Sequence, residues 1–344
     1  MRNDKLGDFM LAWPLFALLK HYWPEAHISA LVPDYTAPMA ELCPWIDEVL
    51  IEQKKGTGFP DLFALQRQLH NRRFDAILTL FSTGRVALAA CLARIPYRLA
   101  PATKLAQLCY NHRLTQRRSR SEKPEYAYNL DLGYRLLHDL KGMEIPTGGG
   151  SDDFLPAEIK RPLLQFDENE IDQLRIEFCE ARQLDTEQLL IFIHPGSGGS
   201  ANNLSLGQYA ELANHLQSRR PLAFVITAGP GEEHVARELC DKITTHPATV
   251  LRPQGGLVEL ARHLQLADLF ISNSTGPLHI AAALDRPTAA FYPRHRSATP
   301  LRWQTLNAAD KRLAFVPPPG AQADAVSSID VLAAAQRISE MFLN

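Results

Sequence analysis

The sequence predicts an α/β protein made of two parallel-sheet units. Short apolar segments alternate with amphipathic helical patterns along the whole chain, which is typical of parallel strands covered by helices. Glycine, proline and acidic residues interrupt this pattern at residues 146–153, so a linker is expected there. The 344 residues are enough for two domains of ordinary size. We therefore expect domains at residues 1–155 and 156–344, with ligands at the carboxyl ends of the strands, as in a cleft enzyme.

The first half shows three apolar segments that predict buried strands. They are residues 28–32, 49–51 and 76–80. Helical periodicity lies between and after them, at residues 11–22, 62–69 and 86–93. A further helix is expected at residues 168–182, after the linker.

The second half repeats the alternation more regularly. Strands are expected at residues 189–193, 222–227, 248–251, 269–272 and 288–292, and a helical pattern separates each from the next. An amphipathic helix at about residues 328–342 closes the chain. Strict alternation of this kind predicts one parallel sheet with helices on both faces.

Composition narrows the class of protein. Apolar residues make up 46% of the chain and charged residues 22%, as in soluble globular proteins, and the net charge of −2 argues against a general polyanion binder. The five cysteines are scattered without a CxxC pair, which favours a reducing compartment and disfavours a structural zinc site. The sequence shows no signal peptide and no apolar run of about 20 residues. A cytoplasmic protein is expected, with at most a peripheral contact at the inner membrane.

The most informative motif is Ser272-Asn-Ser-Thr-Gly-Pro-Leu-His279. A strand ends in small polar residues, the chain turns at Gly276, and a helix begins at the next residue. Ser274 and Thr275 are placed to cap this helix, whose free N–H groups favour an anion, and His279 lies one turn further on. An ordinary capped helix in an α/β core is an equally weighted alternative.

Two glycine-rich loops follow earlier strands of the same half. One is His194-Pro-Gly-Ser-Gly-Gly-Ser200, which contains Gly196, Ser197 and Gly198, and the other is Ala228-Gly-Pro-Gly-Glu232. Parallel strands bring such loops to one edge of the sheet, where backbone N–H groups can hold a diphosphate. The three loops together predict a nucleotide-type ligand. They match neither a Walker sequence nor GxGxxG, so a dinucleotide fold is disfavoured.

Asp8 follows Gly7 near the start of a predicted helix. It reads either as an N-cap or as a general base that takes a proton from an attacking hydroxyl. The twelve histidines show no metal-ligand spacing, so no metal is expected.

A basic run extends from Arg113 to Lys123, with five Arg or Lys and one Glu. It is either a solvated loop, a site for an acidic acceptor, or a contact with an anionic membrane surface. Nucleic acid is disfavoured because no aromatic residues are interleaved.

Together these motifs resemble the heptosyltransferase family, glycosyltransferase family nine, over nearly the whole chain. The resemblance rests on Arg2, Gly7-Asp8 and Pro14, on His194-Pro-Gly-Ser197, and on the segment from Ser272 to His279 with residues 281–283, Pro287, 291–293 and 302–303. It implies a GT-B architecture, in which two Rossmann-like domains face each other across a cleft. It also implies a metal-independent, inverting transfer of a heptose or related sugar from an ADP-sugar to a lipopolysaccharide core or related glycan. No cofactor is implied, and the acceptor is an anionic glycolipid.

The resemblance also implies roles for individual residues. Asp8 stands at the catalytic base, and Glu232 stands where an acid meets the nucleoside ribose. Residues of the loops after the strands are implied to bind the diphosphate and sugar of the donor: His194, Gly196, Ser197, Gly198, Asn202, Ser274, Thr275, Gly276 and His279. The acceptor is assigned to the first domain. Arg85, Arg117, Arg118 and Arg120 are our candidates for binding it.

Three departures from the family pattern keep alternatives open. Members of the family usually have a strand before the arginine that corresponds to Arg2, and its loss would expose strand edges and loosen the placement of Asp8. Ser274 replaces a usual aspartate, and Asn202 stands where a lysine is frequent. The alternatives are a degenerate member that binds nucleotide or glycan without catalysis, and a GT-B sugar-nucleotide epimerase.

Overall fold

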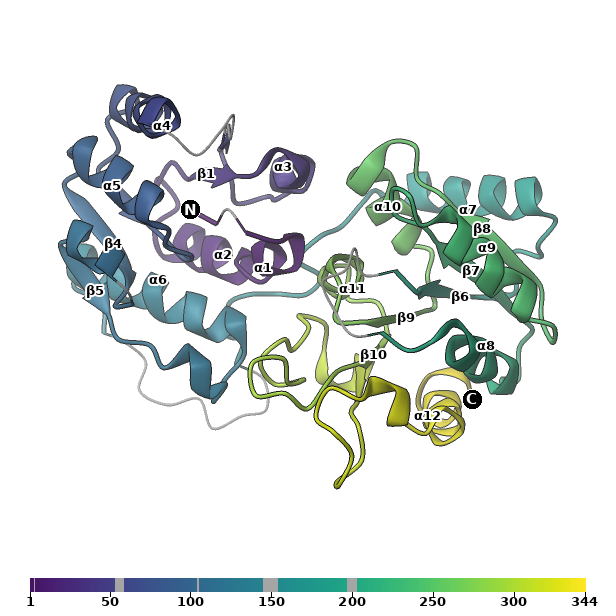
Figure 1. The fold of residues 1–344 in the computed structure, drawn as a ribbon. Coiled ribbons are helices and arrows are strands. Elements are labelled where there is room, and N and C mark those ends of the chain that lie inside the picture. Colours follow the sequence, from purple (N-terminus) through teal and green to yellow (C-terminus); the bar gives the residue numbers. More distant parts are fainter. Residues whose placement is uncertain (3, 53–58, 104, 145–153, 197–202) are drawn as a thin grey trace. The chain divides into compact units, whose positions relative to one another are not determined.

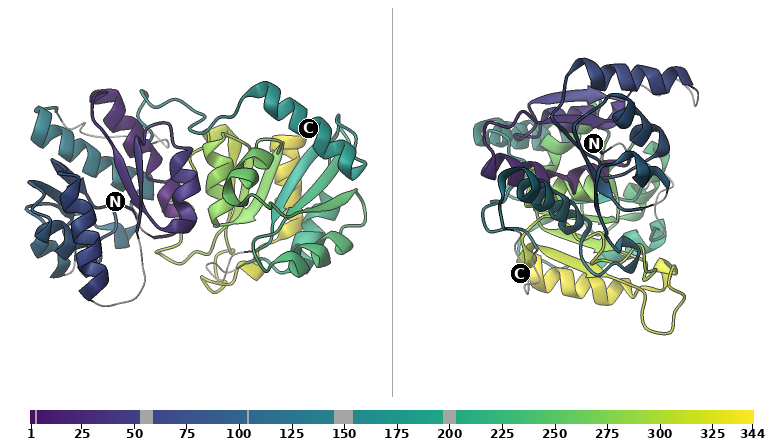
Figure 2. Two further views of the ribbon diagram at one scale, coloured as in Figure 1. Left: turned by 90° about the horizontal axis from the view of Figure 1, so that it is seen from above. Right: turned by 90° about the vertical axis from the view of Figure 1, so that its left-hand side faces the viewer.

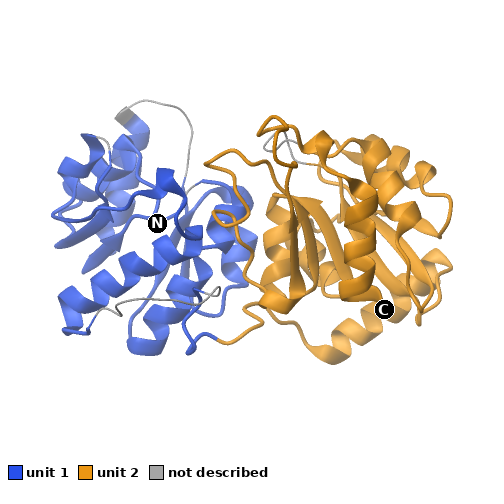
Figure 3. Cartoon of the chain, turned by 90° about the horizontal axis from the view of Figure 1, so that it is seen from below, with its two compact units in different colours: residues 1–159 blue, residues 160–344 orange. Residues whose placement is uncertain are grey.

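A computed structural model of the chain describes all residues except 3, 53–58, 104, 145–153 and 197–202. The chain forms two compact units, Met1–Ile159 and Lys160–Asn344 (Figure 3). The sequence pattern divides the chain after residue 155, a few residues earlier. The expected linker at residues 146–153 lies outside the described residues.

Unit 1 contains two small parallel sheets (Figure 1). In the first, β1 (Ser29–Val32) pairs with β2 (Glu48–Ile51). In the second, β4 (Tyr97–Pro101) lies between β3 (Ala76–Leu78) and β5 (His112–Leu114). The helices of unit 1 are α1 (Leu6–Met10), α2 (Trp13–Tyr22), η1 (Asp34–Thr36), α3 (Ala37–Glu41), α4 (Phe59–Asn71), α5 (Gly84–Leu92), η2 (Leu105–Cys109), η3 (Arg118–Arg120) and α6 (Glu125–Lys141).

The first two residues lie between these sheets. The Met1 amine donates to the Leu78 carbonyl over 2.6 Å, and the Leu80 N–H donates to the Met1 carbonyl over 3.0 Å. On the other side, the Arg2 N–H donates to the Leu31 carbonyl over 3.2 Å. Part of each strand edge that the sequence predicts to be exposed is therefore paired with Met1 and Arg2. Because α1 begins a few residues later, these bonds also fix the start of the segment that carries Asp8.

The predicted helix at residues 11–22 is confirmed as α2, which begins two residues later, and the short helix α1 precedes it. The α-helical pattern starts earlier, in α1, and breaks at Leu11 and Ala12 before α2. The helix α2 packs against α6, and Gly133 of α6 is needed there because a Cβ would collide with the Leu15 side chain. The sequence of α6 contains many polar residues, so its pattern does not predict the face that is buried against α2.

Unit 2 is built on one parallel sheet with the strand order β11-β10-β9-β6-β7-β8. The strands are β6 (Leu189–His194), β7 (Leu222–Thr227), β8 (Ala248–Leu251), β9 (Leu269–Asn273), β10 (Thr288–Phe291) and β11 (Arg312–Phe315). The first five are confirmed within one residue of their predicted ends. The sequence pattern does not predict β11, which is an edge strand.

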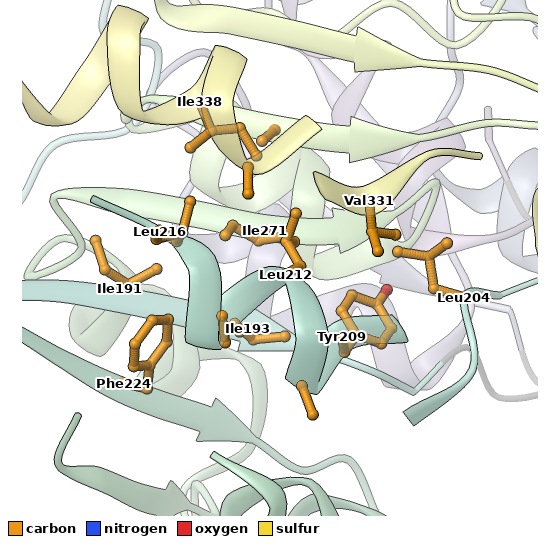
Figure 4. Packing of buried hydrophobic residues seen from close by; sticks show 14 of the residues in the cluster. Ile191, Ile193, Leu204, Tyr209, Leu212, Leu216, Phe224, Ile271, Val331 and Ile338 are labelled. Atoms are coloured by element: carbon orange, nitrogen blue, oxygen red, sulfur yellow. The ribbon is translucent and has the colours of Figure 1, made fainter. Parts of the chain in front are cut away.

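Helices cover both faces of this sheet (Figure 2). Ile191 and Ile193 of β6 belong to the main hydrophobic core, together with residues of α8, α9 and α12 (Figure 4). Phe192, which points to the opposite face, stacks on Phe178 of α7. The helices are α7 (Glu168–Arg182), α8 (Leu206–His215), α9 (Glu233–Lys242), α10 (Gly256–Leu264), α11 (Gly276–Ala283), η4 (Ala309–Lys311), η5 (Val326–Ser328), α12 (Val331–Ile338) and η6 (Ser339–Leu343).

None of the helices in the described part of the chain has both the length and the apolar character needed to cross a bilayer.

Candidate functional site

The sheet of unit 2 changes direction between β6 and β9. From β6 the chain continues through α8 to β7 on one side, whereas β9 leads through α11 to β10 on the other side. Ligands of open α/β sheets bind at such a switch point, outside the carboxyl ends of the strands. The three loops singled out in the sequence follow β6, β7 and β9, which are neighbours in the sheet. The predicted shared edge is therefore present.

Three polar residues near the ends of these strands are joined by hydrogen bonds. His194 Nδ1 lies 2.9 Å from Thr227 Oγ1, and Ser272 Oγ donates to the His194 carbonyl over 3.2 Å. Burial lowers the pKa of His194, while the nearby Glu232 carboxylate opposes that shift. His194 therefore stays neutral near pH 7 and organises the edge by hydrogen bonds rather than by charge.

Glu232 joins the two glycine loops. Its Oε2 atom accepts the Gly229 N–H over 3.1 Å, and a Cβ added at Gly196 would collide with the same carboxylate. A side chain at residue 196 would therefore force the Glu232 carboxylate out of its present position. The side chain can present a carboxylate to a hydroxyl-bearing ligand at the point where the two loops meet. Ser197, Gly198 and Asn202 lie outside the described residues, so their predicted roles remain predictions.

The helix after β9 begins as the sequence predicts, but its cap differs. Thr275 is the N-cap residue of α11, with Gly276 and Pro277 in the first turn. The expected side-chain cap is wrong, because neither Ser274 nor Thr275 caps the helix through its hydroxyl. Thr275 Oγ1 instead lies 2.9 Å from Ser272 Oγ. The first N–H groups of α11 are therefore left for another partner, which is what an anion site needs.

His279 lies in the second turn of α11 and is 2% exposed. Within the described residues its Nδ1 atom is buried without a hydrogen-bond partner. Burial lowers the pKa of His279 to about 4. The ring is neutral at pH 7, so any contact with a diphosphate would be a hydrogen bond and not an ion pair.

This histidine should make the stability of unit 2 depend on pH. The unfolded state binds its proton below about pH 6.5 and the folded state only below about pH 4, so stability falls as pH falls through that window. Between pH 7.5 and pH 5 we expect a loss of about 2 kcal/mol in opening free energy from this residue. Hydrogen exchange of the β9–α11 peptides at the two pH values measures it. His279→Gln should flatten the difference, and an unchanged difference would contradict the assignment.

Gly196→Ala tests the junction of the two loops. The added methyl group should push the Glu232 carboxylate aside and weaken ADP binding by about tenfold, the effect of one lost charge-assisted contact. Calorimetric titration with ADP measures the change. Gly207→Ala is the matched control, because a Cβ there meets only Ser205 Oγ at 3.9 Å. Equal ADP affinity in both variants would show that Gly196 does not contribute to the ADP site.

The predicted base lies in unit 1, in the first turn of α1. Asp8 Oδ1 forms an ion pair with Arg2 Nη2, and the Asp8 side chain is 15% exposed whereas that of Arg2 is 2% exposed. Arg2 also pairs with Asp4 at 2.8 Å and with Glu125 at 3.0 Å. One buried guanidinium therefore orients a carboxylate that keeps partial access to solvent, as a general base requires.

The four candidate acceptor residues differ in their ion-pair partners. Arg118 donates to Glu125 over 2.5 Å, which ties it to the Arg2 cluster and corrects its reading as part of a solvated run. Arg85 pairs with Glu52, and Arg120 with Glu122 at 3.5 Å. Arg117 is exposed and forms no ion pair with another described residue. Arg117 and Arg120 are the members of the set whose charge is most accessible.

The sequence pattern does not single out several residues that build these sites. Thr227, the last residue of β7, positions His194, and its only signal is a polar residue at the end of an apolar strand. Tyr209 of α8 is fully buried and contacts the Asn273 side chain over 2.8 Å. Glu125 carries no sequence signal, since a charged residue at a helix start normally faces solvent.

Comparison with known proteins identifies the family of the chain. The model of Glycosyltransferase family 9 (heptosyltransferase) matches residues 62–319. A putative glycosyltransferase of Haemophilus influenzae is 45% identical over 320 residues, covering 93% of this chain and 89% of that protein.

Solved structures show the same fold at low identity. The structure of Escherichia coli ADP-heptose lps heptosyltransferase II matches with a TM-score of 0.73 and 18% identity, covering 99% of this chain and 97% of that one. The E. coli heptosyltransferase WaaC with ADP matches with a TM-score of 0.67 and 17% identity, covering 98% and 97%. The fold is thus of the GT-B type, as the resemblance implies. The chain belongs to glycosyltransferase family 9, the heptosyltransferase family.

Proposed function

We propose that this glycosyltransferase moves a heptose, or a closely related sugar, from an ADP-sugar to a lipopolysaccharide core or related glycan. The observation that carries the proposal is the set of three loops at the switch point of the unit 2 sheet, with Gly196 and Gly229 meeting at Glu232. Two of the similar structures support the donor class, since their names specify ADP-heptose and ADP.

The proposed donor site stabilises a diphosphate through backbone groups. The free N–H groups at the start of α11 face the same edge as the glycine loops, and a helix N-terminus favours negative charge. Neutral His279 adds a hydrogen bond, and the Glu232 carboxylate suits a ribose hydroxyl. These contacts can stabilise a departing ADP without a metal, which is the proposed mode of leaving-group activation.

The proposed reaction is a single inverting displacement. Asp8 takes the proton of the acceptor hydroxyl. At the same time the acceptor oxygen forms a bond to the anomeric carbon, and the bond from that carbon to the phosphate oxygen breaks. ADP leaves with the electron pair. Asp8 belongs to unit 1 and the donor loops belong to unit 2.

A donor screen tests the proposal. The purified chain is incubated with ADP-heptose, other ADP-sugars and UDP-sugars, with a truncated lipopolysaccharide core as acceptor, and the release of nucleotide and the mass of the glycan are measured. We expect transfer with ADP-heptose or a related ADP-sugar. ADP binding without turnover would favour the degenerate alternative, and conversion of a sugar nucleotide without acceptor would favour the epimerase.

Arg117 and Arg120 are the proposed contacts for the anionic part of the acceptor. Replacing both by glutamine should raise the KM for acceptor several-fold at low salt, with a smaller effect at high salt, because exposed charges are screened. Steady-state kinetics at two salt concentrations measure this. Arg237→Gln with Lys242→Gln removes two exposed cations of unit 2 and should leave that KM unchanged. An equal change in both double variants would reject the assignment.

A further inference from the structure

Four exposed leucines lie on two neighbouring elements of unit 1, and we call them the leucine patch: Leu88, Leu92, Leu105 and Leu108. Their exposed fractions are 39%, 45%, 85% and 75%. The first two are on α5 and the other two on η2, and these two elements pack against each other. Side chains of this size are normally buried, so an apolar surface of this extent calls for a partner.

The leucines lie in an unusually basic part of the chain. Residues 76–121 contain eight Lys or Arg and no Asp or Glu. The described cations of this segment include Arg94, which is exposed beyond the end of α5, and Arg113, which is exposed on β5. Neither forms an ion pair with another described residue. The patch is therefore bordered by positive charge that no carboxylate of the described residues neutralises at these two positions.

The register of the sheet places Arg113 on the same face as the patch. Tyr97 and His112 stack at 4.0 Å, and both contact Asp139 of α6, so they lie on the α6 face. Arg113 follows His112 and points to the opposite face, beside Ala100. Ala100 packs with residues of α5 and η2, which therefore cover that face. Arg113 thus belongs to the surface that carries the leucines.

We propose that the leucine patch, with Arg94 and Arg113, docks the protein on an anionic lipid bilayer. Exposed apolar side chains can enter the boundary between headgroups and acyl chains, and nearby cations are attracted to anionic lipids. A second copy of the chain is the less fitting occupant, because a two-fold interface would set these cations against themselves. The inference rests on the proposed function in one respect, since a glycolipid acceptor lies in such a bilayer.

Vesicle sedimentation with the full chain tests the proposal. Binding to mixed phosphatidylcholine–phosphatidylglycerol vesicles is expected, with much weaker binding to phosphatidylcholine alone. Leu105→Ser with Leu108→Ser should weaken binding by on the order of tenfold for each leucine. Arg94→Gln with Arg113→Gln should weaken it by about fivefold for each cation and reduce its salt dependence. Leu332→Ser, at a 45% exposed leucine of unit 2, is the matched control.

Three outcomes would overturn the docking surface. They are equal binding to neutral and anionic vesicles, leucine variants that bind like the Leu332→Ser control, and a concentration-dependent dimer that the leucine variants abolish without any vesicle binding. The measurement needs neither donor nor turnover. Failure of the donor screen would therefore leave the docking result standing, and failure of docking would leave the transfer assay unaffected when a soluble acceptor is used.

Discussion

Replacing Asp8 by asparagine should lower kcat for sugar transfer by about 10²–10⁴-fold, the range expected when a general base is lost. The asparagine amide keeps the size of the side chain but cannot accept the proton of the acceptor hydroxyl. ADP affinity should stay within about twofold of the native value, because Asp8 and the donor loops belong to different units of the chain. Transfer kinetics and calorimetric titration with ADP, on the same preparation, measure the two effects.

The control has to separate lost basicity from lost charge in unit 1. Asp34→Asn removes an exposed carboxylate of η1 and should leave kcat unchanged. The pH profile gives a second test, since an essential base produces an acidic limb in kcat/KM that Asp8→Asn should remove. Turnover near the native level in Asp8→Asn would show that another group takes the proton.

The sequence predicts unit 2 far better than unit 1, for a physical reason. The strands of unit 2 are continuous apolar runs, because helices bury both faces of the sheet, and such runs are easy to recognise. In unit 1, β5 is only His112–Leu114 and carries an arginine, and β4 includes Arg98. These strands form because they pair with neighbours, as Leu99 does with His112, and local sequence does not contain that information.

The same distinction holds for the sites. Glycine-rich loops after strong strands reveal the shared edge of unit 2, because topology alone brings them together. The hydrogen bond from His194 to Thr227 follows from register and is accessible only once the strands are paired. In the basic run, composition predicts the surroundings of a side chain wrongly. Composition predicts a solvated Arg118, yet Glu125, seven residues further on, binds it in a largely buried cluster.

That cluster leads to the second large effect, which is the loss of Arg2. The Arg2 guanidinium is almost fully buried and pairs with Asp4, Asp8 and Glu125. Glu125 is 1% exposed. Burial raises the pKa of Asp4 to about 7, although Arg2 opposes the shift. Without Arg2, Glu125 would keep its ion pair with Arg118, whereas Asp4 and Asp8 would lose the ion pair that the structure gives them.

Arg2→Met should therefore destabilise unit 1 by about 3–5 kcal/mol, the cost of leaving buried charges without their partner. Methionine retains much of the packing volume, so the loss reports mainly the charge. Guanidinium unfolding followed by tryptophan fluorescence measures it, because Trp13, Trp23 and Trp45 all belong to unit 1. Arg72→Met is the matched control, since its pair with Glu48 is about one-third exposed and should contribute less than about 1 kcal/mol.

A double variant separates charge balance from simple loss of packing. If Arg2 stabilises unit 1 by compensating Glu125, then Glu125→Gln should be costly in the native chain but should recover part of the loss in Arg2→Met. The recovery should be at least about 0.5 kcal/mol, because contacting charged residues couple by that amount or more. Strictly additive effects would mean that the two side chains act independently. In that case the link from Arg118 through Glu125 would have no influence on the Arg2–Asp8 pair.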